Sequence, residues 1–222
     1  ACSTRSIQTI TSAPGLPRVL VVETFLADIV RNVAGDRLII DSLLPINMDA
    51  HSYQPAPRDI IKISNSDVLV INGGGLEAFL TPLLDNAGGS RLLITGSQGL
   101  SPRPDLTGEH PEGDPHFWLD PLLVIQYVEN IRAGLIQADP QGSQLYSDNA
   151  DAYIIQLKAL DAWIVEQVAL IPPDNRQLVT NHESLGYFAA RYGFTVVGSI
   201  IPGFSSESAP TARQLVTLIE RE

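Results

Sequence analysis

Three of the four histidines of the chain lie just past predicted strands or in loops between predicted elements. They are His51 in the stretch Asp49 to Tyr53, His116 in Asp114-Pro115-His116, and His182, which precedes Glu183. Neutral imidazole is a common zinc ligand, and three imidazoles plus one oxygen complete a tetrahedral site. Each histidine has Pro, Asp or Glu neighbours that could fix the backbone or accept a hydrogen bond from the ring. His51, His116 and His182 are therefore candidate metal ligands, although no compact His-x-x-His pattern supports them.

The elements that must position these histidines alternate between strands and helices. Apolar, β-branched runs predict strands, and apolar residues spaced three or four apart predict helices. The strands are expected at 18–23, 38–44, 67–72, 91–95, 177–180 and 194–197, and the helices at 25–34, 58–66, 76–87, 122–136 and 183–191. This alternation predicts an α/β fold with parallel sheets flanked by helices. In such sheets ligands bind at the carboxyl ends of the strands.

One further helix is predicted to be unusually long. It begins near Asp139-Pro140, where Asp139 is the expected N-cap and Pro140 the first helical residue, and it keeps an apolar stripe until Pro172-Pro173. About 30 residues would span roughly 45 Å, which suits a strut between two lobes. We therefore predict an N-terminal α/β lobe over 1–138, a linking helix over 139–171, and the start of a C-terminal α/β lobe over 172–222. The last lobe is expected to be incomplete, because the helical pattern at 215–222 has no stop signal.

The composition excludes several functional classes. The 222 residues include 14 Lys+Arg and 25 Asp+Glu, a net charge of −11, which argues against a nucleic-acid partner. The single cysteine, Cys2, excludes an intramolecular disulfide or a Cys-rich metal site. No apolar run reaches the roughly 18 residues of a membrane span. Ala1-Cys2 could be the end of a processed bacterial lipoprotein signal, so membrane association is expected only through a lipid on Cys2.

Other motifs favour ordinary structural roles. His182-Glu183 starts like a zinc-protease helix, but Gly186 stands where the second histidine of H-E-x-x-H belongs. Gly73-Gly74-Gly75 lacks the G-x-G-x-x-G pattern, so a tight strand-to-helix turn is expected. Trp118 is expected to be a core aromatic residue, and His110 a solvated loop residue.

Several segments, taken together, resemble one protein family. They are Thr24-Phe25 with 30–36, 51–55, 114–121, 180–183 with 186–188, and 203–207. In this order they resemble the cluster A-I solute-binding proteins, the metal-binding subunits of zinc and manganese ABC importers. The resemblance runs from about residue 18 to the end of the chain. It implies two α/β lobes joined by one long helix.

The resemblance also implies a ligand set and a biological setting. His51 and His116 would bind the metal from the first lobe and His182 from the second. Manganese-type members usually have Glu at the third position, so His182 favours Zn²⁺ as the transported ion, with Mn²⁺ as the alternative. The fourth ligand would be an acidic residue beyond residue 222; Glu207 does not match that motif. The expected protein is a monomer that is periplasmic or at the cell surface and delivers metal to an ABC permease and its ATPase subunit.

Three alternatives remain open. The first is a manganese or iron receptor of the same fold. The second is a zinc hydrolase, because three histidines with an open water position is a catalytic arrangement and Glu183 would be its candidate base. The third is a surface adhesin, for which the sequence offers no evidence of its own. The preferred interpretation is a metal receptor without enzymatic activity and without catalytic residues.

Overall fold

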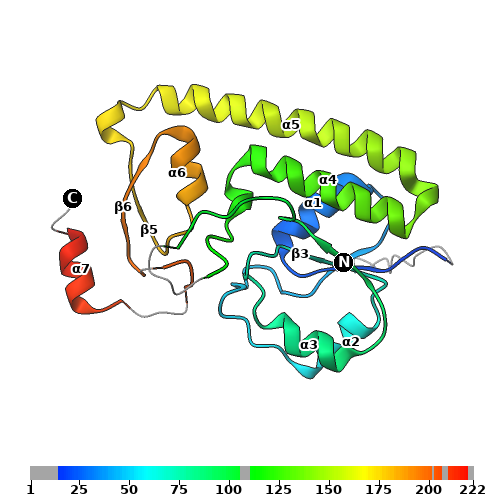
Figure 1. The fold of residues 1–222 in the computed structure, drawn as a ribbon. Helices are drawn as coiled ribbons and strands as arrows, with labels where there is room; N and C mark the ends of the chain where they lie inside the picture. The colour runs from blue at the N-terminus through cyan, green and yellow to red at the C-terminus, as the bar shows by residue number, and fades with distance from the viewer. Residues whose placement is uncertain (1–14, 106–110, 202, 207–209, 220–222) are drawn as a thin grey trace, which may run out of the picture.

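The first sheet, which contains the strand labelled β3 in Figure 1, is parallel and four-stranded. Its strand order is β2-β1-β3-β4. The computed structural model describes residues 15–105, 111–201, 203–206 and 210–219. Within these residues a second, two-stranded parallel sheet pairs β5 with β6. The strands are β1 (Val19–Val21), β2 (Ile40–Ser42), β3 (Val68–Ile71), β4 (Leu92–Thr95), β5 (Gln177–Thr180) and β6 (Thr195–Ser199). The predicted α/β class with parallel sheets is therefore confirmed.

Helices cover both faces of the four-stranded sheet. Val19 and Val21 belong to the apolar core formed with α1 (Thr24–Ala34) and α4 (Pro121–Ala138). Leu20 and Val22 point to the opposite core, formed with α2 (Pro57–Ser64) and α3 (Leu80–Ala87). This burial on both faces explains why β1 reads as a continuous apolar run without polar alternation.

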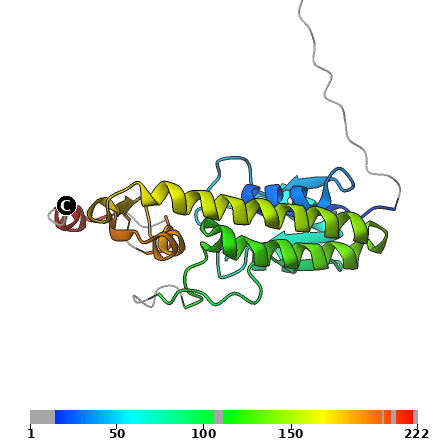
Figure 2. The same cartoon turned by 90° about the horizontal axis from the view of Figure 1, so that it is seen from above.

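The long helix α5 (Ser143–Ala169) has 27 residues, about 40 Å at 1.5 Å each. Seen from above, it lies beside α4 along the first sheet and continues past it (Figure 2). Its later part reaches α6 (Gly186–Tyr192), where Asp161 accepts hydrogen bonds from Arg191 at 2.5 and 2.6 Å and from Tyr192 at 2.9 Å. The helix α5 thus packs against α1 and α4 beside the first sheet and against α6 beside the second, as expected of a linking helix.

The linking helix starts four residues later than the predicted 139–171. Residues Pro140–Gly142 form a 3₁₀ turn, η2, and the α-helix begins at Ser143. Asp139 does not cap it, because its carboxylate accepts hydrogen bonds from Arg37 at 2.5 and 2.9 Å and from Tyr146 at 2.6 Å. The division into 1–138, 139–171 and 172–222 remains a prediction.

The remaining described elements are short. They are the 3₁₀ turns η1 (Phe117–Leu119) and η3 (Pro173–Asn175) and the helix α7 (Ala212–Ile219). None of the helices in the described residues combines the length and apolar character needed to cross a bilayer. Cys2, His110 and Glu207 lie outside the described residues.

Candidate metal centre

Three loops carry the candidate ligands to one point. His51 lies between β2 and α2, at the carboxyl end of the first sheet. His116 ends the long connection from β4 and directly precedes η1. His182 follows β5, so it comes from the second sheet. The loops of two sheets therefore contribute histidines to a single cluster.

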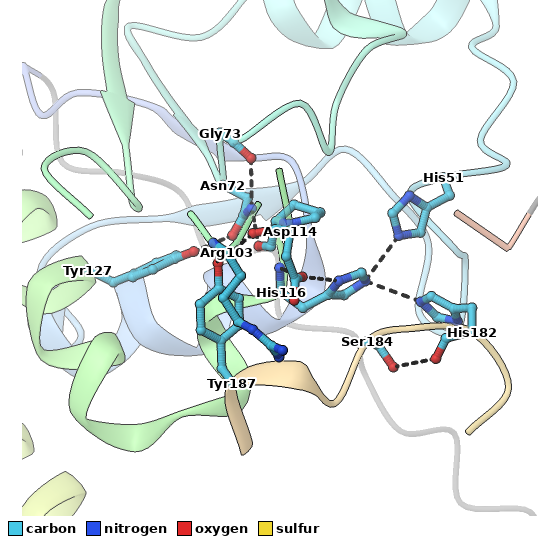
Figure 3. Close-up of polar contacts among 11 residues, drawn as sticks. His51, Asn72, Gly73, Arg103, Asp114, His116, Tyr127, His182, Ser184 and Tyr187 are labelled. Atoms are coloured by element: carbon cyan, nitrogen blue, oxygen red, sulfur yellow. Dashed lines mark hydrogen bonds and ion pairs between the residues drawn. The ribbon is translucent and has the colours of Figure 1, made fainter. Parts of the chain in front are cut away.

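The three rings meet through the same type of nitrogen atom (Figure 3). The Nε2 of His116 lies 3.2 Å from the Nε2 of His51 and 3.2 Å from the Nε2 of His182. Ring centroids are 5.1 to 5.5 Å apart, and one nitrogen from each ring lies within 4.8 Å of the others. Two nitrogen ligands of a tetrahedral zinc ion, each ~2.0–2.1 Å from the metal, lie about 3.3 Å apart. The spacing therefore fits ligands around one cation.

Hydrogen bonding alone explains this convergence poorly. A neutral imidazole has one N–H donor and one nitrogen lone pair. The Nδ1 of His116 faces the carboxylate of Asp114, which leaves Nε2 as a single acceptor directed at two neighbours. One lone pair accepts one good hydrogen bond, whereas a cation between the three nitrogens satisfies all of them. The arrangement is therefore chemically suited to bind a metal ion.

Asp114 fixes the ring of His116. Its Oδ1 accepts hydrogen bonds from the backbone N–H of His116 at 3.0 Å and from Nδ1 at 2.8 Å. Both side chains are buried, with 0% of Asp114 and 2% of His116 exposed. Because a carboxylate only accepts, the ring hydrogen is assigned to Nδ1 and the metal-facing Nε2 keeps its lone pair. Such carboxylate partners orient metal-binding histidines in many proteins.

Asp49 accepts hydrogen bonds both from the backbone of His51 and from Ser206, a residue that follows β6. Its Oδ1 accepts a hydrogen bond of 3.0 Å from the backbone N–H of His51, and its Oδ2 accepts one from the hydroxyl of Ser206. Partial burial works against ionisation, but the hydrogen bonds from Ser206 and His51 prevail and lower the pKa of Asp49. An ionised carboxylate beside the histidines favours a cation in the site.

His182 is half-buried, and its environment lowers its pKa. Burial lowers its pKa, and the neighbouring His116 lowers it further. Its Nδ1 has no hydrogen-bond partner among the described residues. The lowered pKa favours the neutral ring, the form that binds metal.

A cavity of about 270 Å³ opens beside the three histidines. Phe25 and Trp118 form part of its wall and stack with centroids 4.2 Å apart, and Trp118 lies 5.1 Å from the ring of His116. Trp118 packs against the core, as predicted, but it also shapes the site.

Glu23 also lines this cavity, and sequence reasoning missed it. Glu23 and Glu77 are 3% and 8% exposed. Burial raises the pKa of Glu23 well above its usual value, and the adjacent Glu77 raises it further. Neither carboxylate oxygen of Glu23 meets an N–H or O–H donor of the described residues, so a proton shared with Glu77 is the physical solution. The sequence feature that could have identified Glu23 is its position directly after the buried apolar residues 19–22.

Two other motifs have the structural roles predicted for them. Gly73, Gly74 and Gly75 have φ values of 84°, 63° and 80°, the left-handed region that favours glycine, in the turn after β3. Glu183 lines a separate cavity of about 410 Å³ together with Arg103, away from the three-histidine pocket. The helix after His182 begins only at Gly186, so no protease-like helix carries it.

Comparison with known proteins identifies relatives of the chain. A family model described as ZnuA, the periplasmic component A of a zinc-uptake complex, matches residues 19–221. The chain is 36% identical over 199 residues to the manganese-binding lipoprotein MntA of Halalkalibacterium halodurans, covering 89% of the chain and 64% of MntA. It is 34% identical to the iron-binding protein YfeA of Yersinia pestis, covering 81% of the chain and 58% of YfeA. The chain thus spans about three fifths of the length of these two relatives.

Comparison of the fold with solved structures points to the same family. A crystal structure of ZnuA superposes with a TM-score of 0.80 at 28% identity, covering 92% of the chain and 77% of the ZnuA chain. The two-lobed α/β architecture expected from the family resemblance is thereby confirmed.

Proposed function

The chain belongs to the ZnuA family of metal-uptake components, and from that membership we propose that it is an extracytoplasmic receptor that binds a divalent metal ion for an ABC importer. The observation that carries the proposal is the convergence of His51, His116 and His182 through Nε2 atoms 3.2 Å apart. The proposed ligands are these three imidazoles, with no catalytic residue.

Zn²⁺ is the proposed cargo. Three imidazoles suit zinc, whereas Mn²⁺ prefers sites with more carboxylate and carbonyl oxygen. Relatives of the chain are named for zinc, manganese and iron, so a manganese or iron receptor is the second candidate.

The proposed binding step joins the two sides of the molecule. His51 and His116 come from the side of the first sheet and His182 from the side of the second, so only an arrangement that brings both sides together completes the coordination. Because α5 packs against both sides, we expect a small rocking motion and not a wide hinge. The ion would then pass to the permease, which its ATPase subunit drives.

The proposed location follows from the relatives. MntA is named a lipoprotein and ZnuA a periplasmic component. We therefore propose a periplasmic or cell-surface monomer, with membrane association through a lipid on Cys2. Mass spectrometry of the native N-terminus tests the lipid.

Zinc titration with elemental analysis tests the ligand set. His51→Ala, His116→Ala and His182→Ala, made in the full-length protein, should each weaken Zn²⁺ binding more than the ~10–100-fold cost of losing an outer partner. The metal-free proteins should melt close to the wild type. His110→Ala is the control, because the sequence predicts His110 to be a solvated loop residue outside the ligand set. Wild-type affinity in all three site variants would contradict the proposal.

Thermal denaturation with competing metals separates the two cargo candidates. A ligand that binds only the folded protein raises its melting temperature. We expect Zn²⁺ to raise it more than Mn²⁺ or Fe²⁺ at equal concentration. A rise with Mn²⁺ and none with Zn²⁺ would select the manganese receptor. A hydrolase is disfavoured, because its candidate base, Glu183, lines a different cavity.

A further inference from the structure

Asn72 occupies a junction beneath the site. It directly follows β3 and is fully buried, with 0% of its surface exposed. Its side-chain amide donates hydrogen bonds to the carbonyl oxygens of Pro115 at 3.0 Å and Gly73 at 2.9 Å. Its Oδ1 accepts a hydrogen bond of 2.5 Å from the hydroxyl of Tyr127, on α4 (Figure 3). The residue after Pro115 is the candidate ligand His116.

These contacts permit only one orientation of the amide. The carbonyl oxygens of Pro115 and Gly73 are acceptors, so both must face the NH₂ group of Asn72. A flipped amide would place its own oxygen against two carbonyl oxygens in a buried position. The Tyr127 hydroxyl meets the remaining oxygen, and Tyr127 is itself fully buried. Both N–H donors of the Asn72 amide and its oxygen therefore have hydrogen-bond partners.

The backbone of Asn72 is held just as firmly. The carboxylate of Glu77 accepts hydrogen bonds from the backbone N–H groups of Asn72 and of Gly73, the latter at 3.1 Å. The carbonyl oxygen of Asn72 accepts from the Ser97 hydroxyl at 2.6 Å and from the Ser97 backbone N–H at 3.1 Å. Asn72 is thus a rigid point to which the peptide before His116 is attached.

We propose that Asn72, oriented by Tyr127, is a positioning residue for the metal site, because it anchors the Pro115 carbonyl and so sets where His116 stands. This inference rests on the proposed metal-binding function. The peptide on the other side of Pro115 is also fixed, because the Tyr187 hydroxyl donates to the Asp114 carbonyl oxygen at 2.7 Å. Metal ligands must be held within about 0.5 Å of the productive geometry, and buried hydrogen bonds supply that accuracy.

Asn72→Asp and Tyr127→Phe test the proposal. Aspartate cannot donate to the Pro115 and Gly73 carbonyl oxygens, so we expect Zn²⁺ binding to weaken about 10–100-fold, as for other lost outer partners. Tyr127→Phe keeps the ring, removes only the hydroxyl and should weaken binding several-fold. Affinity is measured by competition with a chromophoric chelator. The visible absorption of bound Co²⁺ reports the coordination geometry and should change in both variants.

Tyr146→Phe is the matched control. Tyr146 is also a fully buried tyrosine whose hydroxyl donates to a side chain, Asp139, at 2.6 Å, and it does not line the three-histidine pocket. It should lower the melting temperature of the metal-free protein, with unchanged Zn²⁺ affinity and Co²⁺ absorption.

Two outcomes overturn the inference. If Tyr127→Phe and Asn72→Asp melt earlier but keep wild-type Zn²⁺ affinity and Co²⁺ absorption, the network is only structural. Should Asn72→Asp fail to fold, Tyr127→Phe alone decides. A wild-type protein that binds neither Zn²⁺ nor Co²⁺ overturns the proposed zinc receptor as well, which distinguishes the two failures.

Discussion

The Oδ1 atom of Asp114 accepts hydrogen bonds from both the backbone N–H and the ring Nδ1 of His116, at 3.0 and 2.8 Å. These two hydrogen bonds to one carboxylate oxygen, within three residues of chain, set both the backbone conformation and the tautomer of a candidate ligand. Because both residues are buried, water does not compete for either hydrogen bond.

Asp114→Asn should weaken Zn²⁺ binding about 10–100-fold. Asparagine removes the negative charge behind the ring and offers an N–H donor, which favours the tautomer with hydrogen on Nε2. Isothermal titration measures the loss. Asp85→Asn, an exposed change on α3, is the control and should bind as the wild type does. Equal Zn²⁺ affinities for the two variants would show that Asp114 does not influence metal binding by His116.

Zn²⁺ affinity should fall as the pH drops. Protons compete with the metal for imidazole nitrogen, and the ordinary pKa of histidine is about 6.5. Burial and His116 lower the pKa of His182, so the ring of this candidate ligand stays neutral to a lower pH than free imidazole does. We expect nearly constant affinity from pH 8 to 7 and a loss of about tenfold or more per pH unit below about pH 6. Titrations in a series of buffers test this, and an affinity unchanged down to pH 5 would contradict a histidine site.

Glu23→Gln should stabilise the metal-free protein at neutral and alkaline pH. Burial beside Glu77 raises the pKa of Glu23, so the folded state retains a proton that the unfolded chain releases. The wild type therefore has this contribution in full below the ordinary glutamate pKa of about 4.3 and loses it as the pH rises towards the folded-state pKa. Glutamine keeps an N–H donor for Glu77 and carries no charge. Its advantage in urea unfolding should be large at pH 8 and small at pH 4; a difference independent of pH would contradict the shared proton.

Tyr146→Phe should cost about 1–2 kcal/mol of stability through the lost hydrogen bond to Asp139. For a protein of this size that is a decrease of roughly 2–8 °C in melting temperature, measured by calorimetry. Asp139 keeps its two contacts with Arg37, so the corner between α1 and α5 should remain folded. A change below 1 °C would show that this hydroxyl is replaceable by water.

The sequence alone was enough for the elements and for the identity of the candidate ligands. Apolar runs such as 18–23 and the apolar stripe before Pro172 are local patterns, because a strand or helix repeats its contacts every few residues. His51, His116 and His182 were recognisable from residue type, from their place after strands and from the family resemblance. Element ends were less accurate: α3 begins at Leu80 and α6 at Gly186, each later than predicted.

Only the tertiary structure decided what surrounds those ligands. The 3.2 Å approach of His51 to His116 joins residues 65 positions apart, and the Tyr127–Asn72 hydrogen bond joins residues 55 apart. The pairing of Glu23 with Glu77 and the removal of Asp139 from its predicted capping role are equally non-local. Such contacts depend on how the sheets and helices pack, and they leave no periodic trace along the chain. Residue type, local periodicity and the family resemblance therefore predict the candidate ligands, whereas packing determines how accurately their side chains are held.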